Sequence, residues 1–328
     1  MINEPMDVLT RFPVRKTRLQ KQLFRDAVCA YAKEQEYPVQ VEEGRFGIHN
    51  VVIGDPEKAT YLITAHYDTP ARLLIPNLLT PTNPVIFVLY QLLLMGYALL
   101  PAFVLSFLPA LAVLFAGAAW WFTPEQGVEL GTLVVLVWIF SLLALMFLCL
   151  ALLFVGPANK NNANDNTSGV VTLLEILRTL PDNQRGKVCF VLFDLEEAGL
   201  LGSANYRKAH PNSANQLIIN LDCVGDGDHI RMFPTKKLKA DRKALTSLYK
   251  GCGYFGKKDL LVQEKGFAFN PSDHMLFSRG VGIIALKKGR FGLYLDKVHT
   301  RKDTQLDQTN VNLLRAALIT LVSSDAAQ

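Results

Sequence analysis

The chain has 328 residues, half of them hydrophobic, and its 34 Lys and Arg residues slightly outnumber its 29 Asp and Glu residues. A basic excess this small is common in soluble proteins, so we infer no nucleic-acid partner. The five cysteines are scattered and form no CxxC pair. This excludes a disulfide scaffold and a structural zinc site held by cysteines, and it favours a reducing compartment.

Charge is nearly absent from one long stretch of the chain. Residues 79–156 contain no Lys or Arg, and Glu125 and Glu129 are their only charges. Two apolar runs, 84–122 and 130–155, each exceed the roughly 20 residues needed to cross the hydrocarbon core of a bilayer. A buried core hairpin of this length would need a second globular layer around it. We therefore predict an inserted transmembrane hairpin of two helices.

The insertion divides the rest of the chain into residues 1–78 and 157–328. These 250 residues carry 34 positive and 27 negative charges, and they are enough for one well-buried domain. Within the first apolar run, Pro101 and Pro109 each remove a helical hydrogen bond. We expect them to divide that run into a crossing helix and an interfacial or kinked piece.

Outside the insertion, predicted strands alternate with predicted helices. The apolar patterns indicate helices at 17–35, 167–180, 203–210, 239–250 and 311–322, and strands near 39–44, 47–55, 61–66, 187–195, 216–222 and 282–288. Such alternation predicts an α/β fold with a mixed, mostly parallel central sheet sandwiched by helices.

Acidic and histidine side chains follow the ends of several predicted strands. They are His66 and Asp68 in YLITAHYD, Asp165 in NDNTSG, Glu196 and Glu197 in FDLEEAGLLGS, Asp222 in NLD, and His299 in KVHTRKDT. Ligands of α/β proteins bind at the carboxyl ends of the strands. Adjacent carboxylates repel each other and are costly to bury unless a cation compensates them. The pattern therefore predicts a cation site.

Six motifs together resemble the zinc aminopeptidases of family M28, which use two co-catalytic zinc ions. In chain order they are HYD, DNTSG, EEAGLLGS, NLD, SDHMLFSRG at 272–280 and VHT. The resemblance covers essentially all of the chain outside the insertion and the N-terminal helix. It implies a zinc-exopeptidase fold, two Zn²⁺ ions, and a peptide substrate with a free N-terminus.

The resemblance also implies a role for each residue of the predicted site. Asp165 would bridge the two zinc ions. His66 and Asp222 would complete the ligand set of one ion, and Glu197 and His299 would complete the set of the other.

Two further carboxylates would act without binding metal. Glu196 would be the general base that takes a proton from the attacking water. Asp68 would accept a hydrogen bond from the second ring nitrogen of His66 and so fix the tautomer of that imidazole. The resemblance further implies a cis peptide bond between Asp165 and Asn166.

Other features are assigned more ordinary roles. Val298 stands where several relatives have a Tyr before the last ligand, so the contribution of that Tyr to catalysis has no counterpart here. His274 is expected in a pocket wall or just behind the ligands. GCGYFG, at 251–256, follows a helix and is interpreted as a helix stop and turn instead of a dinucleotide motif. The remaining histidines, His49, His210 and His229, are expected in surface or turn positions.

Three functions remain open at this stage. The first is a membrane-anchored di-zinc exopeptidase. The second is a single-zinc acyltransferase like glutaminyl cyclase, which the lack of a Trp just before His299 disfavours. The third is a catalytically inactive membrane scaffold of the same fold. The intact Glu196 and the five intact ligand positions argue against the scaffold.

The position of the insertion constrains how the chain crosses a membrane. His66 precedes it and Asp165 follows it, and both must reach one metal centre, so the number of crossings is even and two is the simplest count. The connecting loop 123–129 carries no Lys or Arg, and the first 30 residues contain no apolar segment of a signal peptide. We therefore expect an integral membrane protein with a cytoplasmic catalytic domain and with residues 123–129 outside.

Overall fold

The computed structural model describes residues 1–73, 75, 77–118 and 124–324, with side chains described outside 118–128. The chain forms two compact units. The first, here called the globular unit, comprises Met1–Phe87 and Ala158–Gln328. The second, the helical unit, comprises Val88–Pro157.

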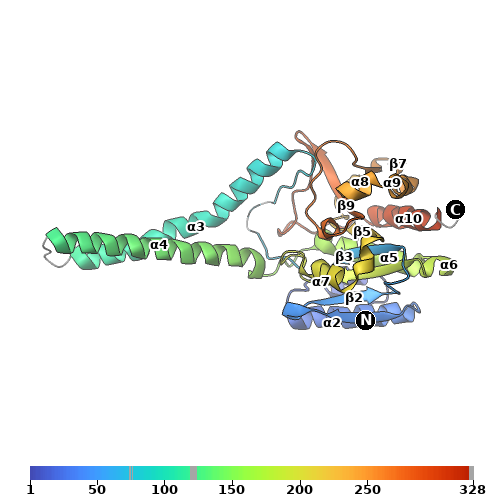
Figure 1. Ribbon diagram of the computed structural model, residues 1–328, viewed down its shortest axis with the longest axis horizontal. Coiled ribbons are helices and arrows are strands. Elements are labelled where there is room, and N and C mark those ends of the chain that lie inside the picture. The colour runs from blue at the N-terminus through green and yellow to red at the C-terminus, as the bar shows by residue number, and fades with distance from the viewer. Residues whose placement is uncertain (74, 76, 119–123, 325–328) are drawn as a thin grey trace. The chain divides into compact units, whose positions relative to one another are not determined.

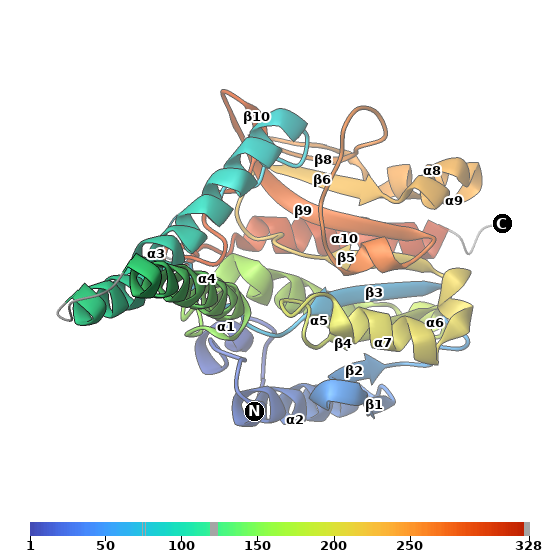
Figure 2. The same ribbon diagram turned by 60° about the vertical axis from the view of Figure 1, so that its left-hand side comes forward.

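The globular unit is built on one ten-stranded sheet (Figures 1 and 2). Its strands are β1 Val39–Glu43, β2 His49–Ile53, β3 Tyr61–His66, β4 Val188–Phe193, β5 Leu217–Leu221, β6 His229–Pro234, β7 Gly253–Phe255, β8 Lys258–Val262, β9 Gly280–Gly289 and β10 Gly292–Tyr294. Their order is β1-β2-β4-β3-β5-β9-β6-β8-β7, with β10 pairing with β9. The central strands β4, β3, β5 and β9 are parallel, and antiparallel pairs extend the sheet on both sides. The predicted mixed sheet is confirmed.

Helices cover both faces of this sheet. They are α1 Asp7–Arg11, α2 Arg18–Glu34, α5 Gly169–Thr179, α6 Asp182–Arg185, α7 Leu201–Ala209, α8 Lys236–Ala240, α9 Arg242–Leu248 and α10 Gln308–Ser324. Neighbouring strand residues point to opposite faces. Leu62 therefore packs with Tyr206 of α7 in one core cluster, whereas Ile63 packs with α2, α5 and α10 in the other. The predicted sandwich of helices around the sheet is confirmed.

Several elements differ from the sequence-based expectation. The helix predicted at 239–250 is broken, because the side chain of Asp241 accepts a hydrogen bond from Ala244 N and begins α9 as a separate helix. Strand β6 was not predicted, and part of GCGYFG forms β7 instead of a turn. On α2, Leu19 and Leu23 follow the helical spacing but are 64% and 53% exposed.

The helical unit consists almost entirely of α3 Pro84–Ala118 and α4 Pro124–Val155. By length and composition, Pro84–Gly117 and Glu129–Val155 are candidate membrane spans. The two helices contact each other along small residues of α3, where Ala102, Ser106 and Ala110 are buried four residues apart. Trp138 Nε1 of α4 donates a hydrogen bond to Ser106 Oγ over 3.0 Å. Small residues at such spacing let helices approach closely.

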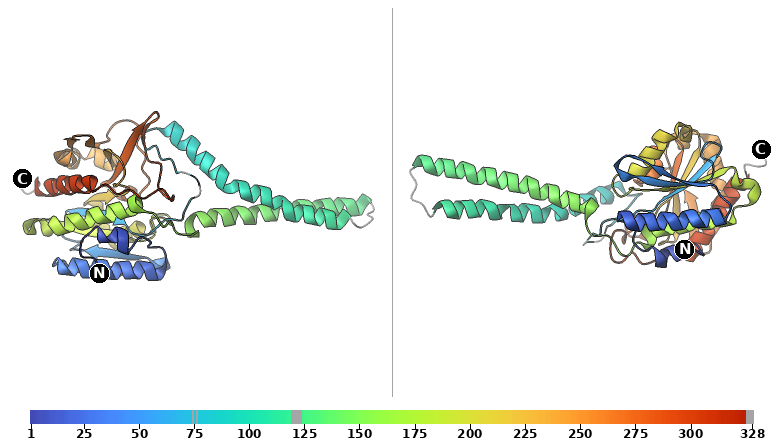
Figure 3. Two further views of the ribbon diagram at one scale, coloured as in Figure 1. Left: turned by 180° about the vertical axis from the view of Figure 1, so that it is seen from behind. Right: turned by 90° about the horizontal axis from the view of Figure 1, so that it is seen from below.

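Two expectations for this unit need correction. Pro101 and Pro109 lie inside one uninterrupted helix, so the run is not divided into separate helices, although the helix bends as expected of a kinked piece (Figure 3). Each proline removes only one hydrogen bond, and the rest of a 35-residue helix keeps its own. Residues 124–129 of the expected loop are helical, because α4 already begins at Pro124, a residue favoured in the first helical turn. Thr123 lies outside the described residues.

Candidate metal centre

The parallel register of the central strands brings the candidate residues to one edge of the sheet. His66, the last residue of β3, is paired with Phe193, the last residue of β4. On the other side of β3, Thr64 is paired with Asn220 of β5. The residues that follow these strands, among them Glu196 and Asp222, therefore leave the sheet at the same edge as His66.

The carboxylate of Asp165 lies between two histidines. Its Oδ1 is 3.2 Å from His66 Nε2, and its Oδ2 is 2.9 Å from His299 Nε2. Asp222 Oδ1 is 3.7 Å from the same nitrogen of His66, and Glu197 Oε2 is 3.3 Å from that of His299. The five residues thus form two clusters that share Asp165, and within each cluster the potential ligand atoms lie within 4.8 Å of one another.

This donor set fits zinc. Imidazole nitrogens and carboxylate oxygens are ligands that Zn²⁺ accepts readily. His66 and Asp165 are only 1% and 4% exposed, so the donors are largely shielded from water. Glu197 Oε1 is buried and has no hydrogen-bond partner among the described residues. A buried carboxylate oxygen without a donor is costly unless a cation meets it.

The charges of the cluster stabilise one another. Burial disfavours a protonated His66, but Glu196 and the neighbouring carboxylates hold the pKa of this imidazole well above its usual value. Burial also acts to raise the pKa of Asp165, yet His299 and His66 hold it below its usual range. For Glu196 burial dominates and raises the pKa well above that of an exposed glutamate. The carboxylates thus favour positive charge between them, whether it is carried by an imidazole or by a bound cation.

Asp68 makes different contacts from those expected. Its Oδ1 is 3.5 Å from His66 Nδ1, beyond the usual length of a hydrogen bond. Its two carboxylate oxygens instead accept the backbone N–H groups of Glu196 and Glu197, at 3.1 and 3.2 Å. Asp68 therefore holds the turn that carries both glutamates.

A second carboxylate, Asp303, holds the turn of Asp165 in the same way. It accepts hydrogen bonds from the backbone nitrogens of Asn164 and Asp165, at 2.8 and 3.0 Å. Asp303 is 1% exposed, and burial raises its pKa to about 7. Sequence reasoning missed this residue, although it lies in the motif that contains His299 and only four positions beyond it.

The turn at Ala163–Ser168 connects Asp165 to the end of β5, next to Asp222. The Asp165–Asn166 peptide bond is cis, as the resemblance implied. Asn166 Nδ2 donates to Leu221 O over 2.9 Å, directly before Asp222. The side chains of the DNTSG motif therefore hold the ends of β5 and of the Asp165 turn together.

The SDH segment supports Asp222 from the other side. Ser272 Oγ donates to Asp222 Oδ2 over 2.6 Å and accepts a hydrogen bond from Asn220 Nδ2 over 2.8 Å. His274 is 3% exposed and lines a cavity of about 570 Å³. Burial lowers the pKa of His274 to about 4, so the imidazole is neutral at pH 7. It forms a pocket wall, as expected.

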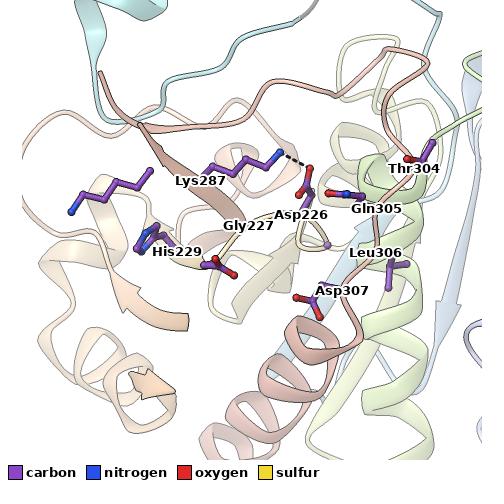
Figure 4. A pocket seen from close by; sticks show the side chains of 11 residues that line it. Asp226, Gly227, His229, Lys287, Thr304, Gln305, Leu306 and Asp307 are labelled. Atoms are coloured by element: carbon purple, nitrogen blue, oxygen red, sulfur yellow. Dashed lines mark hydrogen bonds and ion pairs between the residues drawn. The ribbon is translucent and has the colours of Figure 1, made fainter. Parts of the chain in front are cut away.

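The other histidines lie outside the groups of described residues that could hold a metal. His210 contacts Glu42 and Glu57, and His229 begins β6 and contacts Asp259 over 3.0 Å. His229 also lines a cavity of about 770 Å³ (Figure 4). Acidic and basic side chains there pair with each other, as Lys287 Nζ does with Asp226 Oδ2 at 2.7 Å.

Comparison with known proteins agrees with the fold. The mixed sheet with helices on both faces, and with histidines and carboxylates gathered at its carboxyl edge, is that of the zinc-exopeptidase fold. The model of peptidase family M28 matches residues 153–322, more than half of the chain. The chain therefore belongs to peptidase family M28. A search of curated proteins finds no match.

Solved structures of low sequence identity share this fold. The chain is similar to Porphyromonas gingivalis glutaminyl cyclase, with 18% identity over 98% of each chain and a TM-score of 0.55. It is also similar to the Legionella pneumophila aminopeptidase LapA, with 12% identity over 99% of this chain and 72% of that one and a TM-score of 0.56. A Bacteroides thetaiotaomicron glutaminyl cyclase bound to N-acetylhistamine has 13% identity over 95% and 92%, with a TM-score of 0.53.

Proposed function

We propose that this protein is a membrane-anchored aminopeptidase with two zinc ions, which hydrolyses N-terminal residues from peptides. One observation carries the proposal. The two oxygens of Asp165 each contact a different histidine, so that two ligand clusters share one carboxylate. A single-metal site has no need of a second imidazole on the far oxygen of the same carboxylate.

Each ligand cluster would hold one ion. His66 and Asp222 would bind one zinc together with Asp165 Oδ1, and Glu197 and His299 would bind the other together with Asp165 Oδ2. When bound, the zinc ions supply Lewis acidity, polarising the scissile carbonyl and making a water more acidic.

Glu196 is placed to move the proton. Its carboxylate lies within 4.8 Å of potential ligand atoms of His66 and Glu197. Burial raises its pKa well above the usual value, which makes it a stronger base than an exposed glutamate. It would take a proton from the attacking water and deliver it to the leaving amine. Asp68 would keep this base oriented through the backbone N–H groups of Glu196 and Glu197.

A metal analysis combined with a substrate panel tests the proposal. Purified protein should contain two zinc ions per chain, and it should release the first residue from aminoacyl and dipeptide substrates. Removal of zinc by a chelator should abolish this activity, and added zinc should restore it. An active enzyme with one zinc per chain, which cyclises peptides beginning with glutamine but hydrolyses none, would instead support the acyltransferase function.

The membrane anchor is part of the proposal. The candidate spans contain 34 and 27 residues, with a mean hydropathy of 2.4 and 3.0. We propose that residues 79–156 are a transmembrane hairpin inserted in a peptidase domain formed by 1–78 and 157–328. The globular unit would lie in the cytoplasm. All 34 Lys and Arg residues lie outside the insertion, and basic residues favour the cytoplasmic side.

Cysteine labelling in intact cells tests the orientation. A single cysteine introduced at Thr123 or Gln126 should react with a membrane-impermeant reagent, and a cysteine at the exposed Lys243 should not. The five natural cysteines would first be replaced by serine or alanine. The reverse pattern of labelling would place the peptidase on the outer face of the membrane.

A further inference from the structure

A buried arginine lies beside the candidate metal centre. Arg15 belongs to the segment between α1 and α2, and it is 0% exposed. Its pKa is lowered to about 10 by burial, whereas Asp68 and Asp165 act in the opposite direction. Arg15 is therefore charged at neutral pH, and the carboxylates that favour its charge belong to the candidate metal centre.

The contacts of Arg15 join two segments of that centre. Its backbone nitrogen donates to Thr69 Oγ1 over 2.8 Å, and its Nε donates to the carbonyl oxygen of Tyr67. Its Nη1 donates to Thr167 Oγ1 over 3.1 Å. Tyr67 and Thr69 flank Asp68 directly after His66, whereas Thr167 lies two residues after Asp165. One guanidinium thus connects the end of β3 to the turn that carries the shared carboxylate.

The burial of this charge needs a compensating partner. The hydrogen-bond acceptors that Arg15 contacts are neutral carbonyl and hydroxyl oxygens, and its Nη2 has no partner among the described residues. The guanidinium also lies over the ring of Phe24, 5.4 Å from its centroid. Burying an arginine without a directly paired carboxylate is costly. The nearby anionic cluster therefore stabilises Arg15, and Arg15 in turn stabilises the cluster.

We propose that Arg15 is a positioning residue of the metal centre, which holds His66 and Asp165 in the arrangement that two zinc ions require. The role rests on the proposed function, because it presupposes a zinc site at these residues. Partners behind the ligands commonly fix the orientation of those ligands, and their loss typically weakens metal binding or activity by about 10–100-fold.

The chain offers a matched control in Arg25. This residue is also a buried arginine, 9% exposed, and its Nη1 donates to the hydroxyl of Tyr67 over 3.0 Å. This contact is with the hydroxyl at the end of the Tyr67 side chain, whereas Arg15 contacts the backbone of Tyr67, directly after His66. A purely structural effect of losing a buried arginine should therefore appear in both Arg15→Met and Arg25→Met.

The experiment measures zinc affinity by competition with a chromogenic chelator, and thermal unfolding with and without zinc. Arg15→Met should weaken zinc binding about 10–100-fold and reduce the rise in Tm that zinc produces. Arg15→Lys keeps the charge but loses the fork of donors, so it should recover part of the affinity. Arg25→Met should lower the Tm of the apo protein but leave the zinc affinity unchanged.

Several outcomes would overturn the proposal. One is an Arg15→Met variant that loses stability but binds zinc as tightly as the wild type, or more tightly. Another is an equal loss of zinc affinity in Arg25→Met. If Arg15→Met does not fold, Thr167→Val removes the contact of Arg15 Nη1 with the Asp165 turn and should weaken zinc binding in the same direction; unchanged affinity there contradicts the role. Failure of the wild type to bind zinc would be a distinct result that overturns the proposed function itself.

Discussion

The globular and helical units differ in where their large apolar side chains lie. In the globular unit, apolar side chains form the core, and the buried polar side chains at the sheet edge are linked by hydrogen bonds. In the helical unit, large apolar side chains remain exposed, among them Phe115, Phe140, Phe147 and Val155 at 70% or more. A large exposed apolar surface is unfavourable in water and marks contact with lipid or another protein. The comparison indicates two parts adapted to different surroundings, in agreement with the proposed membrane anchor.

The largest expected effect is the loss of membrane association when the helical unit is removed. Replacing residues 84–155 with a flexible Gly/Ser linker of about a dozen residues should move the protein from the membrane fraction to the soluble fraction. Zinc content should stay unchanged, because every predicted ligand lies in the globular unit. Fractionation with and without detergent, followed by metal analysis, checks both statements. A deletion variant that still requires detergent would contradict the division of roles between the units.

The next largest effects are expected on kcat and on zinc content, when the two adjacent glutamates are replaced one at a time. Glu196→Gln should keep its zinc but lower kcat by about 10²–10⁴-fold, because an amide cannot accept the proton. Glu197→Gln should instead reduce the zinc content, because it removes a carboxylate from one ligand cluster. Metal analysis and steady-state kinetics distinguish the two. Loss of zinc in Glu196→Gln alone would reverse the proposed roles.

A smaller effect, on zinc affinity, is expected from replacing Asp303, which holds the turn of the predicted ligand Asp165. In Asp303→Asn, the amide NH₂ would face one of the two backbone donors that the carboxylate now satisfies. Zinc affinity should fall about 10–100-fold, measured by chelator competition. Asp259→Asn is the matched control, since Asp259 contacts Arg231 and His229 on outer strands. Equal losses of affinity in both variants would remove the special role of Asp303.

The smallest effect concerns the contact between the two helices. Ser106→Ala removes the acceptor of the hydrogen bond from Trp138 Nε1. Hydrogen bonds between helices in membranes contribute about 0.6 kcal/mol on average. The Tm in detergent should therefore fall by only a few degrees, whereas Ser106→Leu should destabilise the pair more strongly by separating the helices. A large loss in Ser106→Ala would mean that the helical unit also depends on polar contacts.

Much of the fold could be predicted because its signals are local. Continuous apolar strands such as 61–66 and 188–193 are buried on both faces of the sheet, so hydrophobicity alone locates them. The insertion stands out for the same reason, since its length and lack of charge are one-dimensional properties. Strand β6 was missed because no such run marks it, and its burial depends on pairing with β8 and β9.

The sequence by itself determined which side chains could form a metal centre. His66, Asp165, Glu197, Asp222 and His299 each lie in a short motif, and parallel strands bring such motifs to a common edge. The pairing of each carboxylate oxygen with an imidazole nitrogen was decided only by the tertiary structure, because this pairing depends on strand register, turns and side-chain rotation. The division of Asp165 between His66 and His299 is a property of the folded site alone.

The residues that support the ligands were also decided by the tertiary structure alone. Asp68 contacts a turn 128 residues away, Asp303 holds a turn 138 residues away, and Arg15 reaches Thr167 across 152 residues. No local pattern encodes such partners, because a hydrogen bond requires only that two groups meet in space. The ligands can therefore be read from motifs, whereas the contacts that orient them arise when the chain folds.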